Sequence, residues 1–336
     1  MNAARRHRVT HGPTRLARAL TSVVAVATLG GLTACSSVTY DATQVPTKAP
    51  VKSSAAPAVT PQACSNATQS YTPLPSLPSR SEITDQRMRD ILARGYLRVG
   101  VSADTYLFGA NDPSTGTLQG FDIDMARAVA KAIFGDPNKV QLRVITAADR
   151  LPLLEDNQLD LVARNMSMTC DRWAKIAFSA EYYRSGQKVL VGRNLPDATT
   201  LSLQDLKGKK VCAPTGTTSL TKLQQVQGPI VVTAPTHTAC LVLFQQGKAD
   251  AITGDDTVLA GLAAQDPNTV VTKAPAITVE PYGLGTNKDN VFLVRYVNRV
   301  IADLEKSGEW TAMYDRWLRG PLGPAPQPPT PVYGRA

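Results

Sequence analysis

Two arginines and a pair of aspartates stand out as residues able to bind a charged ligand. The planar fork of an arginine can form two parallel hydrogen bonds with a carboxylate, which lysine cannot. Arg150 and Arg172 each lie in a polar segment, whereas Asp255 and Asp256 end an apolar one. Because neighbouring residues of an extended chain point in opposite directions, only one of these aspartates should face a shared site. We favour Asp255.

A short turn, Gly216-Thr217-Thr218-Ser219, leads into a predicted helix. The free N–H groups and positive dipole end of a helix N-terminus suit an anionic group, although the same residues would also serve as a simple cap. His237 is the only histidine after residue 11, and one histidine cannot build a histidine-rich zinc site. No Gly-x-Ser-x-Gly or Gly-x-x-x-x-Gly-Lys motif is present, so we expect no metal, no cofactor, and neither serine-hydrolase nor nucleotide chemistry.

The elements that must position these residues follow an alternating pattern of strands and helices. The pattern occurs twice, which predicts two α/β lobes with parallel sheets. After Gly120, apolar residues recur at helical spacing, with Asp122 as the expected N-cap. The predicted strands are 97–101, 140–145, 159–163, 210–213, 230–233 and 249–253, and further helices are predicted at 85–94, 151–156, 217–223 and 240–246.

The N-terminus has the order of a bacterial signal peptide. The first eighteen residues hold five arginines and no acid, and the apolar stretch from Leu20 to Leu32 has 13 residues. That stretch is shorter than the ~20 residues of a membrane span. It ends at Leu-Thr-Ala-Cys35, which resembles a lipobox, whose cysteine receives a diacylglycerol. We expect loss of residues 1–34 and lipidation of Cys35, on the extracytoplasmic face of the cell membrane; the alternative is a secretory signal followed by a free cysteine.

Loss of residues 1–34 would change the charge of the protein. Lys+Arg falls from 36 to 31 against 27 acids, so a net charge of +9 becomes +4. No basic stripe with interleaved aromatic residues remains, and we expect no nucleic-acid partner.

Four cysteines remain after Cys35, an even number in a compartment where disulfides persist. They allow three connectivities. We favour Cys212 with Cys240, because both lie in one predicted lobe, and Cys64 with Cys170; the alternative is four buried free thiols.

Proline-rich segments flank the folded part. Residues 35–80 hold seven prolines among Ser, Thr, Ala and Val and lack apolar periodicity, which predicts a disordered spacer. Residues 321–336 form a second proline-rich tail, for which we expect a solvated end rather than a docking role.

Several motifs between residues 85 and 320 together resemble one family, the polar amino-acid solute-binding proteins of ABC importers, and its acidic-amino-acid branch most closely. The motifs are Gly120-Phe121-Asp122-Ile123-Asp124, Asn165 to Arg172 with Phe178-Ser179 and Tyr182-Tyr183, Leu206-Lys207-Gly208-Lys209 with Gly216 to Ser219, and Ala249 to Ile252 ahead of Asp255. The resemblance implies an α/β, two-lobe periplasmic-binding-protein fold (type II, Venus flytrap) with two crossing hinge strands. We place the crossings near 189–193 and 278–285, lobe 1 at 81–188 plus 282–320, and lobe 2 at 189–281.

The resemblance also implies roles for individual residues. Arg172 would clamp the α-carboxylate of an amino acid, and Asp255 would hold its α-ammonium group. Arg150 would meet a side-chain carboxylate, which favours glutamate or aspartate over glutamine. Asn165 (backbone carbonyl), Ser167, Thr217, Thr218 and His237 would line the same cleft. The alternatives are a surface ion pair for Arg172, an exposed helix-start residue for Arg150 and a surface histidine at 237; Ser102 stands where relatives often carry a charged ligand residue.

The implied function is that of a lipid-anchored, extracytoplasmic component of an amino-acid importer that binds glutamate, aspartate or their amides. We expect a monomer that is not an enzyme, whose partner is an ABC permease. A sensory lipoprotein that presents its ligand to a membrane signalling protein is the alternative, and a dehydratase with Asp255 as the acid is less favoured.

Overall fold

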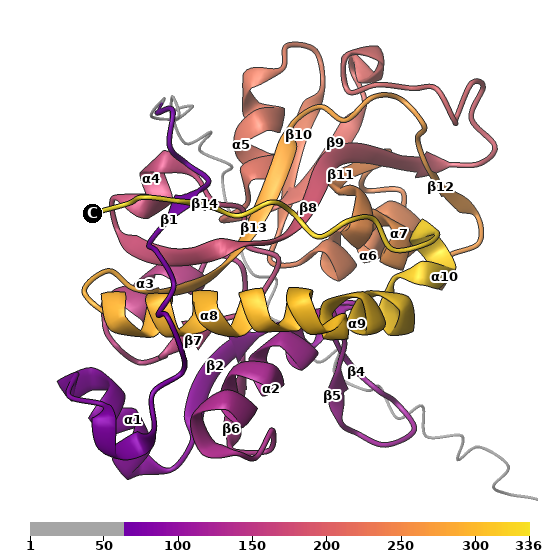
Figure 1. Cartoon of the computed structure of the whole chain (residues 1–336). Helices are drawn as coiled ribbons and strands as arrows, with labels where there is room; N and C mark the ends of the chain where they lie inside the picture. The colour runs from indigo at the N-terminus through magenta and orange to yellow at the C-terminus, as the bar shows by residue number, and fades with distance from the viewer. Residues whose placement is uncertain (1–63) are drawn as a thin grey trace, which may run out of the picture. The chain divides into compact units, whose positions relative to one another are not determined.

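The computed structural model describes residues 64–336 (Figure 1). The predicted signal peptide, Cys35 and the spacer up to residue 63 lie outside the described residues. Within the described part, no helix is long and apolar enough to cross a membrane.

One twisted path of strands runs through both lobes, in the order β10-β9-β11-β8-β13-β7-β2-β6, with β12 paired to β8. Two long strands at its middle, β8 and β13, are antiparallel and belong to both lobes (Figure 1). This is the two-lobe α/β fold with two crossing strands that the sequence predicts. The strands on the path are β2 Leu97–Val101, β6 Val140–Val144, β7 Leu161–Val162, β8 Ile176–Gly192, β9 Lys210–Pro214, β10 Ile230–Ala234, β11 Ala251–Asp255, β12 Thr269–Val271 and β13 Val279–Asn287.

Lobe 1 is built on β2, which pairs in parallel with β6 and β7. The indole nitrogens of Trp310 and Trp317 donate to Tyr182 O and Asp124 Oδ2, so the last helices return to lobe 1 as expected. The helices are α1 Gln86–Arg94, α2 Phe121–Phe134, α3 Arg150–Glu155, α4 Cys170–Trp173, α8 Val291–Ser307, α9 Glu309–Trp317 and α10 Arg319–Leu322, with a 3-10 turn at Arg80–Glu82. A small sheet of β3 Asp104–Thr105, β4 Gly109–Asn111 and β5 Leu118–Gln119 adjoins them.

Lobe 2 repeats the plan, because β9 pairs in parallel with β10 and β11. Apolar side chains fill both faces of this sheet, as two-sided burial of a parallel sheet requires. Its helices are α5 Thr218–Gln225, α6 His237–Gln245 and α7 Asp256–Gln265, with a 3-10 turn at Gln204–Leu206.

Both predicted disulfides are confirmed. Cys212 of β9 is bonded to Cys240 of α6, and Cys64 is bonded to Cys170 at the start of α4. The second bond joins residues 106 positions apart.

Removing the disulfide that closes the shorter loop, Cys212–Cys240, should lower stability. With Cys212→Ser and Cys240→Ser together, we expect the free energy of unfolding to fall by ~3 to 4 kcal/mol, because a closed loop of about 28 residues restricts the unfolded chain. Chemical denaturation monitored by circular dichroism measures the difference. An unchanged midpoint and slope would contradict it.

The predicted disorder of residues 64–80 is wrong. Gln69–Ser70 form β1, which pairs in parallel with β14, Val332–Tyr333, and Ser70 is fully buried. All residues of the tail are at least partly exposed, as a solvated end would be, but the tail is also paired: from α10 it runs back to β1 (Figure 1). Proline-rich composition does not reveal this pairing, because each segment is held by residues far away in the chain.

Two local predictions also need correction. The first crossing was expected at 189–193, but these residues already belong to lobe 2, where β8 pairs with β11 and β12. Asp122 does not cap α2; the N-cap is Gly120, at φ 137°. This position requires glycine, because a Cβ there would lie 2.3 Å from Phe108 O. Asp122 is instead buried and accepts hydrogen bonds from Tyr182 Oη and Asn165 N.

Candidate functional site

All eight residues proposed to bind the ligand line one buried cavity between the lobes. The space left inside is about 20 Å³, room for about one water molecule, so the lobes are closed. An amino acid would enter only with a hinge movement. Arg150, Asn165, Ser167, Arg172, Thr217, Thr218, His237 and Asp255 line the cavity together with Thr105, Arg164, Ser219 and Val258.

Arg172 lies on α4, the single turn whose N-cap Thr169 accepts a hydrogen bond from Arg172 N. Its guanidinium group is buried; Nη1 donates to Ser167 O at 2.6 Å and Nη2 to Gly216 O at 3.2 Å. Burial lowers the pKa of Arg172, whereas the charges of Glu280 and Asp255 raise it. Arg172 is therefore not the surface residue of the alternative interpretation: its guanidinium group lies inside the cleft.

Arg150, the first residue of α3, is equally buried and donates to carbonyl groups from three segments. Nε donates to Ala147 O, Nη1 to Arg164 O and Asn165 O, and Nη2 to Gly216 O, at 2.9 to 3.1 Å. Burial lowers its pKa most, followed by the charges of Arg172 and Arg164. Most of its donors are thus occupied in the closed lobes, and its positive charge remains unpaired by any carboxylate in direct contact among the described residues.

Gly216 is the point at which lobe 2 meets both arginines. Its φ of 75° suits glycine, and a side chain would place Cβ at 2.6 Å from Ala148 Cα in lobe 1. The Gly216 carbonyl accepts from Arg150 and Arg172 at once. Only a residue without a side chain permits this approach of the lobes.

Asp255 and Asp256 point in different directions, as predicted. Asp255 ends β11 and lines the cavity; its Oδ2 accepts from Tyr282 Oη at 2.5 Å. Asp256 instead accepts from Ser185 Oγ. Burial, followed by the charge of Glu280, raises the pKa of Asp255 to about 7, so a cation brought into the cavity would favour its ionisation.

The turn before α5 contributes two kinds of contact. Thr217 is the N-cap; its Oγ1 accepts from Leu220 N and donates to Pro214 O at 2.7 Å, so its hydroxyl is already occupied. Thr218 Oγ1 lies 3.4 Å from Ser167 Oγ across the cleft and donates to Glu280 Oε2 at 2.8 Å.

Two cavity residues carry buried polar atoms that have no hydrogen-bond partner among the described residues: His237 Nε2 and Asn165 Nδ2. Burial and the charge of Arg164 lower the pKa of His237 to about 3, so it is neutral. Asn165 adopts φ 42°, held by the hydrogen bond from its backbone N to Asp122. Buried polar atoms without partners favour a polar ligand beside them.

Sequence reasoning missed Arg164, Glu280 and Tyr282. Arg164 follows β7 directly, at the carboxyl end of a parallel strand, where ligands of α/β sheets bind, and this position could have revealed it. Glu280 and Tyr282 share one face of β13 inside the predicted crossing and contact the lining residues Thr218 and Asp255, but nothing in the sequence shows which face of that strand does so. Ser102 does not line it; its hydroxyl contacts Asp104 and Thr105.

Comparisons with known proteins agree with this architecture. Residues 97–320 match the family "Bacterial extracellular solute-binding proteins, family 3". The ABC transporter glutamine-binding protein GlnH of Bacillus subtilis is 31% identical over 247 residues, which cover 72% of this chain and 89% of that protein. The glutamate/aspartate import solute-binding protein of Escherichia coli is 28% identical over 247 residues, 70% of this chain and 80% of that protein.

Solved structures give the same answer. An ancestral arginine-binding protein bound to glutamine has a TM-score of 0.62 and 31% identity, and covers 67% of this chain and 98% of its own. A solute receptor for L-cysteine of Neisseria gonorrhoeae has a TM-score of 0.66 and 26% identity, with coverage of 70% and 95%. The two-lobe fold and the closed cavity between the lobes agree with the family match over residues 97–320. The chain belongs to the bacterial extracellular solute-binding proteins of family 3.

Proposed function

We propose that this protein is the extracytoplasmic substrate-binding component of an ABC amino-acid importer, and that it binds glutamate or aspartate, with glutamine and asparagine as weaker ligands. One observation carries the proposal: three guanidinium groups and a single carboxylate line one buried cavity between two lobes.

The charges of an amino acid fit this lining. Arg172 would receive the α-carboxylate. Its Nη1 is held by Ser167 O, whereas Nε–H and one N–H of Nη2 form no hydrogen bond within the described residues. Asp255 would receive the α-ammonium group. Both charges need partners because an unpaired ion is costly to bury.

A second carboxylate on the ligand would balance the remaining charge. Arg150, Arg164 and Arg172 carry three positive charges, and among the described residues Asp255 is the one acid of the lining. A neutral side chain would leave Arg150 without a carboxylate in direct contact among the described residues, whereas Glu280 acts on Arg172, and Asp122 on Arg164, from outside the lining. Arg150 would act mostly through its charge, because backbone carbonyls occupy most of its donors, whereas Arg164 has one recorded donor contact, from Nε to Ile145 O.

The names of the relatives support the substrate class. The Bacillus protein is named as the glutamine-binding protein of an ABC transporter, and the Escherichia coli protein as a solute-binding protein for glutamate/aspartate import. Both names refer to an acidic amino acid or to its amide. A tether through Cys35 and the following spacer would keep the protein beside a membrane permease, and remains part of the proposal.

Calorimetry of the purified protein against individual amino acids tests this function. We expect micromolar dissociation constants, about −8 kcal/mol, for glutamate or aspartate, and weaker binding of glutamine and asparagine. Arg150→Ala should narrow the difference in affinity between the acids and their amides, because the side-chain carboxylate of an acid loses a favourable interaction with a positive charge and an amide does not. Arg143→Ala, which removes an exposed arginine that donates to Gln158, is the control. Binding of arginine or lysine alone would overturn the assignment.

A further inference from the structure

Two segments outside the matched range 97–320 meet on lobe 1, beside the helix that carries Arg172. We call residues 64–71 and 332–335 the terminal clasp. β1 and β14 pair in parallel, and Gln69 Nε2 donates to Tyr333 O at 3.1 Å. The two segments thus hold each other as well as the lobe.

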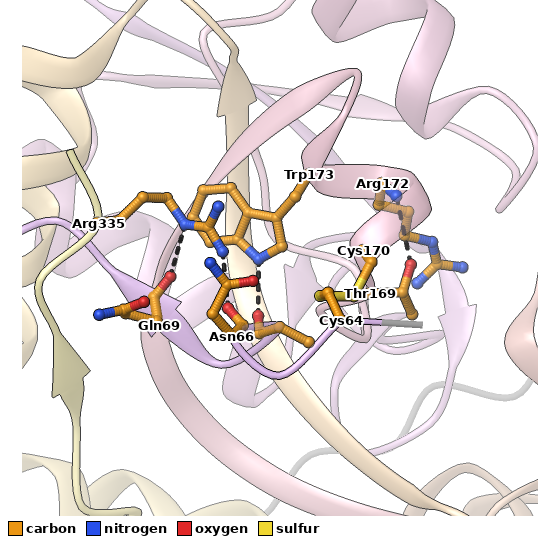
Figure 2. Close-up of a disulfide and its surroundings, with 9 residues drawn as sticks. Cys64, Asn66, Gln69, Thr169, Cys170, Arg172, Trp173 and Arg335 are labelled. Atoms are coloured by element: carbon orange, nitrogen blue, oxygen red, sulfur yellow. Dashed lines mark hydrogen bonds between the residues drawn. A yellow bond between two sulfur atoms is a disulfide. The ribbon is translucent and has the colours of Figure 1, made fainter. Parts of the chain in front are cut away.

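The terminal clasp grips α4 at both of its ends (Figure 2). At the first residue, Cys170 is bonded to Cys64. At the last, Trp173 Nε1 donates to Ala67 O at 2.6 Å, and the guanidinium carbon of Arg335 lies 3.6 Å from the centroid of the indole ring.

Arg335 joins the two halves of the terminal clasp. Its Nε donates to Gln69 O and its Nη2 to Asn66 O, both at 2.7 Å, while the same group covers Trp173 (Figure 2). Arginine is suited to this position, because a flat guanidinium group can stack on a ring while its edge donates hydrogen bonds.

The N-terminal half is itself anchored in the core. Ser70 is fully buried; its Oγ donates to Phe178 O at 2.8 Å and lies 2.9 Å from the donating Asn298 Nδ2. Asn298 Nδ2 also contacts Tyr71 O at 2.7 Å. The core of lobe 1 thus fixes the N-terminal half of the terminal clasp, and the clasp in turn holds α4 in place.

The helix α4 depends on such outside support. It is a single turn of four residues, and an isolated turn is unstable because it fixes several residues for very few hydrogen bonds. Arg172 lies between the two gripped residues, Cys170 and Trp173. Its bidentate geometry toward a carboxylate requires a fixed backbone, since a shift of about 1 Å would break one of two parallel hydrogen bonds.

We propose that the terminal clasp positions Arg172, so that Arg335 and the Cys64–Cys170 disulfide set the affinity for the ligand without touching it. This inference rests on the proposed function, in which Arg172 binds the ligand carboxylate. Arg335, Trp173 and the disulfide are positioning residues, and two of these three features involve residues that lie outside the matched range.

Ligand titration by calorimetry at 25 °C tests the proposal, with circular dichroism and thermal melting to show that each variant is folded at that temperature. For Arg335→Ala we expect the dissociation constant for glutamate or aspartate to rise about 3- to 10-fold, and at least as much for Cys64→Ser with Cys170→Ser. Arg335→Lys should recover part of the loss, because it keeps a cation over the ring but loses the fork. Arg299→Ala is the matched control: Arg299 also donates to the N-terminal segment, at Pro75 O, and pairs with Asp303. Its dissociation constant should stay within 2-fold of the unchanged protein.

Combination with Arg172→Lys separates this proposal from the proposed function. Arg172→Lys should weaken binding, and Arg335→Ala should add no further loss in that background, because the fork to be positioned is absent. Lower melting temperatures with unchanged dissociation constants would show a structural role only and overturn the proposal, as would a full additional loss in the Arg172→Lys background. If Arg172→Lys binds as well as the unchanged protein, the assigned role of Arg172 fails, and the clasp inference fails with it.

Discussion

Arg172→Ala is expected to abolish measurable binding of every amino-acid ligand. A buried pair that loses one partner costs about 3 to 5 kcal/mol, because the other charge stays buried and unpaired, and this corresponds to a loss of about 10² to 10³·⁵ in affinity. The α-carboxylate is common to all amino acids, so the loss should not depend on the side chain. Calorimetry and thermal shift with glutamate, aspartate and glutamine measure it.

The contrast with Arg150→Ala makes this expectation specific. Arg150 donates to four carbonyl groups and would contribute charge, whereas Arg172 keeps donors for the ligand. We therefore expect Arg150→Ala to change the preference among ligands and Arg172→Ala to remove them all. An equal, modest loss in both variants would show that these roles are wrongly assigned.

Much of the fold was accessible from the sequence because local patterns carry it. Strand β2 was predicted with its observed bounds, since a compact apolar run has little choice of environment in a parallel sheet. Arg172 and Asp255 were accessible for a similar reason, because each stands at a fixed place in a short motif or at a strand end. The two residues are 83 positions apart in the chain, and only the pairing of β8 with β11 and β13 brings them to one cavity.

The rest depends on contacts between distant segments. The donors of Arg150 meet carbonyls at 147, 164, 165 and 216, and no local pattern encodes that set. Residues 64–80 were predicted to be disordered and the C-terminal tail to be a solvated end, yet Ser70 contacts Asn298 across 228 positions and Arg335 covers Trp173. Composition describes how a segment behaves alone; a buried serine or a stacked arginine depends on its partner.

Asp255→Asn is the second replacement with a large expected effect. The ligand ammonium group would lose its only charged partner in the cavity lining, and we expect a loss of about 10²-fold in affinity, which corresponds to about 2.7 kcal/mol. Asn is close to Asp in shape and can still accept from Tyr282 Oη, so the fold should be kept. Asp256→Asn is the matched control, because the Asp256 carboxylate meets Ser185 rather than the cavity; its dissociation constant should change less than 3-fold.

The pH dependence of binding provides an independent test of Asp255. Burial, and then the charge of Glu280, raises its pKa from 3.8 to about 7 in the closed lobes, so this form holds a proton that the unfolded chain releases above pH 4. That contribution to stability is present below pH 4 and is lost as the pH rises to about 7. An ammonium group favours the ionised carboxylate, so binding should release a proton below pH 7, and affinity should increase from pH 5 to pH 8 by up to about tenfold per pH unit. Calorimetry in buffers of different ionisation enthalpy counts the released proton. In Asp255→Asn the slope should flatten while Asp256→Asn keeps it, because the Asp255 carboxylate faces the ligand and that of Asp256 does not. The same slope in both variants would assign the titration to another residue.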